Sequence, residues 1–104
     1  VIRDMQTKLR SHGKRAQFIA SGHGDWNYLD VVCEGAGKLE ATVHVRRRLG
    51  FAPEDTACSG DSGNDILMLQ GEERGIVVGN AQQGLLDWLK GVDNASGRIF
   101  RAKR

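Results

Sequence analysis

The sequence predicts an α/β fold in which one helix and a strand hairpin precede parallel strands covered by helices. Two features support this prediction. From residue 56 onward, short apolar runs alternate with stretches of helical periodicity, which is typical of parallel strands joined by crossover helices. Before residue 34, one helical stretch is followed by two strand-like runs. With 104 residues, of which 39% are hydrophobic, the chain can form one modest core.

The first third of the chain predicts a helix and a hairpin. The helix covers residues 1–12, where apolar side chains recur every three or four positions, and it ends at Gly13. The two predicted strands are residues 15–21 and 26–33, joined by a turn at 22–25. We therefore expect a helix followed by a hairpin of two strands.

Residues 38–49 fit two patterns. The stretch 42–45 alternates like a strand, whereas the apolar spacing over the whole segment fits a helix that ends at Gly50. We predict a helix, because the segment is longer than a typical strand. The arginine run 46–48 is predicted to be solvated, since cations suit the end of a helix dipole, and a phosphate-binding patch is the alternative.

The rest of the chain alternates between the two kinds of element. The predicted order is strand 56–59, a helix beginning at 66, strand 75–79, helix 82–90 and strand 98–100. The four apolar residues 66–69 are expected to pack inward. In the later helix, Leu85, Leu86 and Leu89 share one face. This alternation predicts a parallel sheet covered by helices.

Composition and charge narrow the classes of function. A net charge of +2 gives no argument for nucleic acid, and no apolar run approaches the about 18 residues of a membrane helix. We therefore expect neither nucleic acid nor a membrane as a partner. Two cysteines, Cys33 and Cys58, make no disulfide framework, which favours a reducing, cytoplasmic setting. The chain begins at Val1 within a helical pattern, and we interpret it as a piece of a longer protein.

The segment 58–65 concentrates the polar chemistry of the chain. It reads Cys-Ser-Gly-Asp-Ser-Gly-Asn-Asp, and its small residues permit a sharp turn from a strand into a helix. Free N–H groups at such a helix start can bind a phosphate, and the carboxylates of Asp61 and Asp65 can bind a hard cation such as Mg²⁺. A helix cap is the alternative interpretation, because Asp and Ser are favoured there as well.

Three motifs stand in the second part of the chain: Gly-Ala-Gly-Lys at 35–38, Gly-Asp-Ser-Gly-Asn-Asp at 60–65 and Gly-Asn-Ala-Gln at 79–82. Together they resemble the C-terminal half of haloacid-dehalogenase-superfamily phosphatases. The first motif and the run Leu-Asp-Val-Val at 29–32 make the chain most similar to the sucrose-phosphate phosphatases. The resemblance implies a partial Rossmann-like core over residues 34–104. Residues 1–33 would be the end of an α+β cap that recognises the sugar.

The same resemblance implies roles for individual residues. Lys38 and Asp65 would be catalytic, and Asp61 would bind Mg²⁺, the implied cofactor. The implied residues for binding phosphate and substrate are Lys38, Ser62, Asn64 and Asn80. A lysine at a helix start is electrostatically unfavourable, which favours an anion beside Lys38, although a solvated lysine is the alternative.

The implied activity is the hydrolysis of sucrose 6-phosphate to sucrose and phosphate through an aspartyl-phosphate. In the family, the nucleophile lies in an N-terminal D-x-D motif, which this chain does not contain. The N-terminal half of the same protein is therefore an implied partner, and we expect this chain alone to be inactive. One alternative is a phosphatase for mannosyl-3-phosphoglycerate or another sugar phosphate. Another is a non-catalytic domain or remnant of a sucrose-phosphate synthase.

Overall fold

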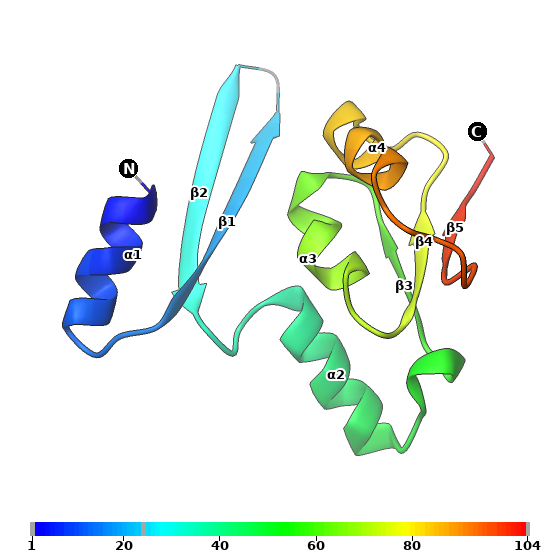
Figure 1. The fold of residues 1–104 in the computed structure, drawn as a ribbon, viewed down its shortest axis with the longest axis horizontal. Helices are drawn as coiled ribbons and strands as arrows, with labels where there is room; N and C mark the ends of the chain where they lie inside the picture. The colour runs from blue at the N-terminus through cyan, green and yellow to red at the C-terminus, as the bar shows by residue number, and fades with distance from the viewer. Residues whose placement is uncertain (1, 24, 104) are drawn as a thin grey trace. The chain divides into compact units, whose positions relative to one another are not determined.

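The computed structural model describes residues 2–23 and 25–103, which divide into two compact units between Gly37 and Lys38. Figure 1 shows the elements in chain order. They are α1 (Ile2–Ser11), β1 (Ala16–His23), β2 (Trp26–Cys33), α2 (Lys38–Leu49), the 3₁₀ turn η1 (Pro53–Asp55), β3 (Ala57–Gly60), the 3₁₀ turn η2 (Gly63–Asp65), α3 (Ile66–Leu69), β4 (Arg74–Val77), α4 (Gln83–Lys90) and β5 (Ile99–Arg101).

The first unit is a helix followed by an antiparallel hairpin, as the sequence predicts. α1 ends before Gly13, whose φ of 70° lies in the left-handed region that glycine adopts without strain. β1 and β2 pair from Ala16 opposite Cys33 to His23 opposite Trp26.

β1 extends into the turn that the sequence predicts at 22–25. Gly22 is still paired with Asn27, so β1 continues two residues beyond the predicted strand end at residue 21. β1 is longer than predicted because its residue-by-residue pairing with β2 continues through Gly22 as far as His23. The predicted turn also includes Gly24, which lies outside the described residues.

The second unit contains a three-stranded sheet in the order β3-β4-β5, and both pairings are parallel. α3 follows β3 and α4 follows β4, so each connection between neighbouring strands carries a helix (Figure 1). The predicted alternation of strands and helices is confirmed. Since the strands are parallel, their carboxyl ends meet at one edge of the sheet, where ligands of open α/β sheets bind.

The core of the second unit joins the sheet to α3 and α4. Leu69 from α3, Leu85 from α4, Val77 from β4 and Ile99 from β5 are its buried hydrophobic residues. Ile66, Leu86 and Leu89 are among the partly buried residues that pack against this cluster. The predicted leucine face of the helix over 82–90 is thus confirmed. The prediction that residue 67 packs inward is wrong, because α3 is a single turn with one inner side, and Leu67 lies exposed.

α2 confirms the helix predicted over residues 38–49, and Gly50 beyond its end has a φ of 78°. One detail of the prediction is wrong. The side chain of Arg46 is not solvated, since it is only 9% exposed and pairs with Glu73. Arg47 and Arg48 are exposed, as expected.

No helix within residues 2–23 and 25–103 is both long and apolar enough to span a membrane.

Candidate active site

The loop that follows β3 brings the polar residues of the 60–65 motif together. β3 ends at Gly60, and η2 leads from this loop into α3. Gly60 is buried, and a Cβ atom placed on it would lie 2.6 Å from Cβ of Asp65. The glycine therefore allows the loop to fold back closely, so that the Asp65 side chain lies directly over the end of the strand.

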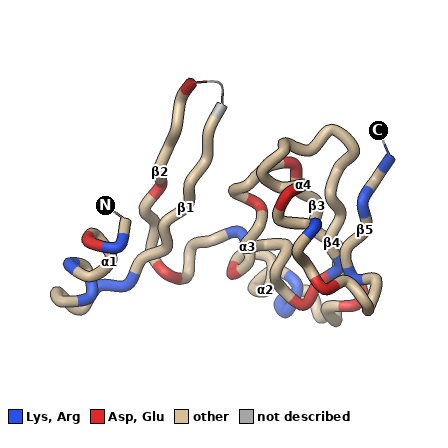
Figure 2. Tube along the Cα trace, turned by 45° about the horizontal axis from the view of Figure 1, so that its top comes forward, with Lys and Arg blue, Asp and Glu red and all other residues tan. Residues whose placement is uncertain are grey.

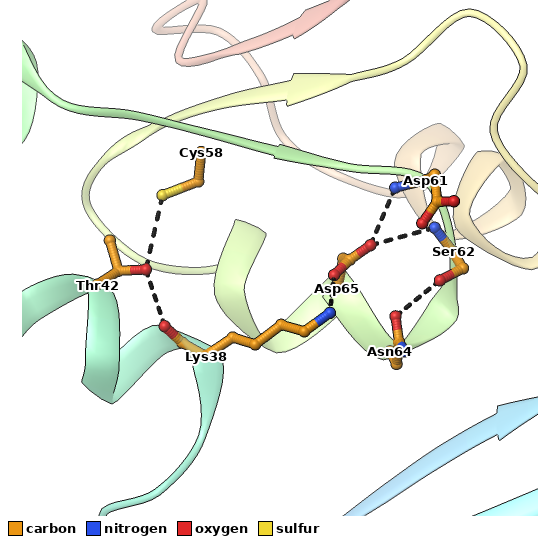
Figure 3. Close-up of polar contacts among 7 residues, drawn as sticks. All are labelled: Lys38, Thr42, Cys58, Asp61, Ser62, Asn64 and Asp65. Carbon is orange, nitrogen blue, oxygen red and sulfur yellow. Dashed lines mark hydrogen bonds and ion pairs between the residues drawn. The ribbon is translucent and has the colours of Figure 1, made fainter.

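The Asp65 carboxylate is the centre of the site (Figure 3). Its Oδ1 accepts a hydrogen bond from Nζ of Lys38 at 2.5 Å, which is also an ion pair. Its Oδ2 accepts hydrogen bonds from the N–H groups of Asp61 at 2.9 Å and Ser62 at 3.3 Å. The Asp65 side chain is 7% exposed, so these donors compensate a buried charge.

The surroundings of Asp65 also decide its charge state. Burial by itself raises the pKa of the Asp65 carboxyl. The Lys38 ammonium and the N–H groups of Asp61 and Ser62 outweigh burial, so that the pKa lies below its ordinary value. Asp65 is therefore an anion at neutral pH, and it holds the cation of Lys38.

Lys38 is the first residue of α2, where the helix dipole disfavours a cation. Its ion pair with Asp65 offsets this cost. The carbonyl of Lys38 accepts a hydrogen bond from Oγ1 of Thr42 at 2.8 Å, and this hydroxyl receives a weak contact from Sγ of Cys58 at 3.8 Å. The Lys38 side chain is 52% exposed, so the lysine borders solvent while its ammonium contacts Asp65.

Ser62 and Asn64 form a second contact within the loop. Oγ of Ser62 donates a hydrogen bond to Oδ1 of Asn64 at 2.7 Å (Figure 3). Both residues are partly exposed. This bond fixes the amide orientation of Asn64, so its NH₂ group is the part that remains for a ligand oxygen.

Asp61 and Asn80 come from neighbouring loops at the carboxyl edge of the sheet. The carbonyl of Asp61 accepts a hydrogen bond from the N–H of Gln82 at 2.7 Å, which joins the loop after β4 to the loop after β3. Asn80 lines a cavity of about 580 Å³, with Arg101 and Lys103 also in its wall. The structure therefore links Lys38, Asp61 and Asp65 directly, whereas Asn80 lies on the adjacent loop.

The donor chemistry of the loop suits a hard divalent cation. Mg²⁺ takes oxygen ligands, and the Asp61 carboxylate is exposed at the strand end. Asp65 is already engaged by Lys38, so Asp61 is the carboxylate of this loop that fits a metal-binding role. In the described part of the chain, no group of three or more His, Cys, Asp or Glu residues forms a complete cation site. Asp61 would thus be one ligand of a site that needs others.

Two features near the site were not predicted from the sequence. The first is the close approach of Gly60 to Asp65. The second is the buried ion pair of Arg46 with Glu73. A sequence signal for the second existed, because Lys38, Thr42 and Arg46 are spaced by four residues and so lie on one face of a helix.

Gly60→Ala tests the packing of the loop. The added Cβ would lie 2.6 Å from Cβ of Asp65, so we expect the carboxylate to shift and the complete protein to lose about 1–3 kcal/mol of stability. Urea denaturation measures this loss. Gly63→Ala is the matched control, because nothing lies within 4 Å of its Cβ position. Equal stability of the two variants would contradict the packing described here.

One protein family matches the chain over its whole length. The family model described as sucrose-6F-phosphate phosphohydrolase matches residues 1–104. Probable sucrose-phosphatase 1 of Arabidopsis thaliana is 36% identical over 92 residues, which are 85% of this chain and 21% of that protein. Sucrose-phosphatase 1 of Nicotiana tabacum is 32% identical over 102 residues, which are 94% of this chain and 23% of that protein. The chain therefore spans about a fifth to a quarter of the length of these relatives.

Solved structures agree with the sequence comparison. The chain resembles the sucrose-phosphatase of Synechocystis sp. PCC6803, solved in complex with sucrose and phosphate, with a TM-score of 0.77 and 32% identity. The match covers 97% of this chain and 39% of that one. A haloacid dehalogenase-like hydrolase from B. subtilis has a TM-score of 0.61 at 22% identity, which supports the fold alone. This chain therefore belongs to the sucrose-6F-phosphate phosphohydrolase family of the haloacid-dehalogenase superfamily.

Proposed function

We propose that this chain supplies the C-terminal part of a Mg²⁺-dependent phosphatase that hydrolyses sucrose 6-phosphate to sucrose and phosphate. The observation that carries the proposal is the Asp65 carboxylate, which binds the Lys38 ammonium through one oxygen and the N–H group of Asp61 through the other. A cation and a potential metal ligand are thus held beside the same strand end. The sucrose and phosphate in the related Synechocystis structure support the choice of substrate.

Each site residue has a proposed task. The Lys38 ammonium neutralises negative charge on the phosphoryl oxygens as the transition state forms, and Asp65 keeps that ammonium in place. Asp61 would hold Mg²⁺, which when bound polarises the phosphoryl group and neutralises part of its charge. Ser62, Asn64 and Asn80 would orient the phosphate and the substrate, because amide NH₂ groups and hydroxyls donate hydrogen bonds to oxygen ligands.

The nucleophile is proposed to be an aspartate in the N-terminal half of the same protein. Its carboxylate oxygen attacks phosphorus, the bond from phosphorus to the sugar oxygen breaks, and that oxygen takes up a proton. Water then attacks phosphorus in the aspartyl-phosphate and gives up a proton to solvent. The bond from phosphorus to the carboxylate oxygen breaks, which releases inorganic phosphate and restores the carboxylate. The part of the site described here stabilises charge in both steps.

The hairpin of the first unit is proposed to be the end of a cap that recognises the sugar, with residues 1–33 as the cap segment and 34–104 as core. Trp26 and Tyr28 alternate along β2, so they share one face of the hairpin, and they are 70% and 55% exposed. Asp30 lies on the same face. Exposed aromatic rings beside a carboxylate combine apolar contact with hydrogen-bond acceptors, as ligand sites do.

The proposed partner is a small sugar phosphate rather than nucleic acid or a membrane. Figure 2 shows basic and acidic positions interspersed along the second unit, which suits local recognition of one small anion. The cytoplasm is the proposed compartment, because Cys33 and Cys58 are free thiols.

A comparison of substrates tests the proposed function. The complete protein should show a higher kcat/KM for sucrose 6-phosphate than for mannosyl-3-phosphoglycerate, with phosphate release measured in the presence of Mg²⁺. A preference for the second substrate would favour the other phosphatase assignment. Hydrolysis of neither compound would favour the non-catalytic remnant and would contradict the proposal.

A further inference from the structure

α2 is attached to the sheet through a polar stripe. Lys38, Thr42 and Arg46 lie four residues apart, and each contacts a residue of the sheet or its loops: Asp65, Cys58 and Glu73 respectively. No residue of α2 itself is fully buried. Directional polar contacts along one face therefore help to set the direction of this helix, beside partly buried apolar residues such as Leu39.

The contact of Arg46 with Glu73 is the most buried of the three. Nε of Arg46 lies 3.2 Å from Oε2 of Glu73, and the two side chains are 9% and 2% exposed. Arg46 also donates from Nη1 to the carbonyl of Phe51 at 3.0 Å, just beyond the end of α2. By contrast, the Lys38 side chain at the other end of the helix is about half exposed.

Glu73 is held in place through its backbone. Its carbonyl accepts a hydrogen bond from Nη1 of Arg98 at 2.7 Å, while Nη2 of Arg98 binds the carbonyl of Leu69 at 2.8 Å. A Cβ atom on Gly71 would lie 2.9 Å from Oε1 of Glu73, so the chain closes tightly around this carboxylate. Glu73 directly precedes β4, so its ion pair with Arg46 connects α2 to the start of a sheet strand.

We infer that Arg46 and Glu73 are positioning residues for Lys38: their buried ion pair fixes the direction of α2, and thereby the place of the Lys38 ammonium. Arg46 lies eight residues from Lys38, about 12 Å along the helix axis. A tilt of α2 about the sheet would therefore move Lys38 away from Asp65. The inference rests on the proposed function, because Lys38 must act on the phosphoryl group for its position to matter.

A double-mutant cycle on the complete protein tests this inference. Glu73→Gln should lower kcat for sucrose 6-phosphate by about 10-fold or more when Lys38 is present. In a Lys38→Ala background the same change should lower kcat by less than about 2-fold, because the group being positioned is gone. A merely structural role of Glu73 would lower kcat by the same factor in both backgrounds, and that result would overturn the inference.

Arg47→Gln is the matched control. Arg47 follows Arg46 on the same helix but is exposed, and we expect kcat to remain within about 2-fold of the unchanged protein. An effect of Arg47→Gln as large as that of Glu73→Gln would show that any charge loss on this helix acts in the same way, and it would overturn the assignment to the buried pair.

A second variant covers the case in which Glu73→Gln does not fold, since breaking a buried ion pair is strongly destabilising. Arg46→Met combined with Glu73→Leu removes both charges and keeps apolar volume, which is often neutral for stability. We expect this variant to melt near the unchanged protein but to retain the lower kcat, because packing lacks the direction of the ion pair. A folded double variant with unchanged kcat would overturn the inference.

Chemical labelling separates this inference from the proposed function. We expect acetic anhydride to modify Lys38 slowly while its ammonium is held by Asp65, and mass spectrometry measures the extent. Faster labelling of Lys38 in Glu73→Gln, but not in Arg47→Gln, supports the positioning role even if the protein hydrolyses no sugar phosphate. Unchanged labelling in Glu73→Gln would contradict it.

Discussion

Lys38→Ala in the complete protein should lower kcat by about two to three orders of magnitude. This is the typical effect of removing one preorganised group that faces developing charge, about 3–4 kcal/mol in the transition state. Stability should fall by only about 1 kcal/mol, because the Asp65 carboxylate keeps its two N–H donors, Asp61 and Ser62. Steady-state kinetics and a thermal melt of the same preparation measure both effects.

Lys38→Arg is the informative companion variant. A guanidinium keeps the charge but presents a planar fork instead of a compact ammonium, so we expect partial recovery of kcat. If Lys38→Ala retained near-normal kcat, the lysine would be a structural partner of Asp65 and the catalytic assignment would be wrong.

We expect Asp61→Asn to weaken Mg²⁺ binding by about 10–100-fold or more. Loss of a residue that only orients a metal ligand already costs about 10–100-fold in metal affinity. The substitution removes a negative charge and leaves the backbone N–H and carbonyl free to keep their bonds to Asp65 and Gln82. Isothermal titration with Mg²⁺ measures the effect.

Asp87→Asn provides the control for this titration. Asp87 is an exposed carboxylate on α4, where it pairs loosely with Lys90 at 3.8 Å. We expect Mg²⁺ affinity to be unchanged in this variant. If Asp61→Asn also left the affinity unchanged, Asp61 would serve the loop through its backbone alone.

Much of the fold was predictable because its signals are local. The helical spacing of Leu85, Leu86 and Leu89 and the glycine-bounded apolar run at 75–79 correctly indicate a helix and a strand of the second unit. The ambiguous segment 38–49 was resolved by its length and by Gly50, whose positive φ ends α2. These features depend on neighbouring residues, which a single sequence contains.

The pairings between distant residues were not predictable in the same way. The motifs indicated Lys38 and Asp65 separately, but their contact joins residues 27 positions apart and depends on how α2 meets the loop after β3. Arg46 was predicted to be solvated as part of an arginine run, whereas its partner Glu73 is equally distant in sequence. Such contacts are decided by the tertiary packing of elements. The sequence shows that Arg46 shares a helix face with Lys38 and Thr42, but not which distant residue that face meets.

The central claim is that Lys38 and Asp61 form one phosphatase site at the carboxyl edge of the sheet. The most direct measurement is the initial rate of phosphate release from sucrose 6-phosphate by the complete protein with Mg²⁺, compared among Lys38→Ala, Asp61→Asn and the control Arg47→Gln. The claim predicts that the first two variants each lose at least about 100-fold in rate and that the control keeps its rate. Rates in Lys38→Ala and Asp61→Asn equal to that of the unchanged protein would contradict it.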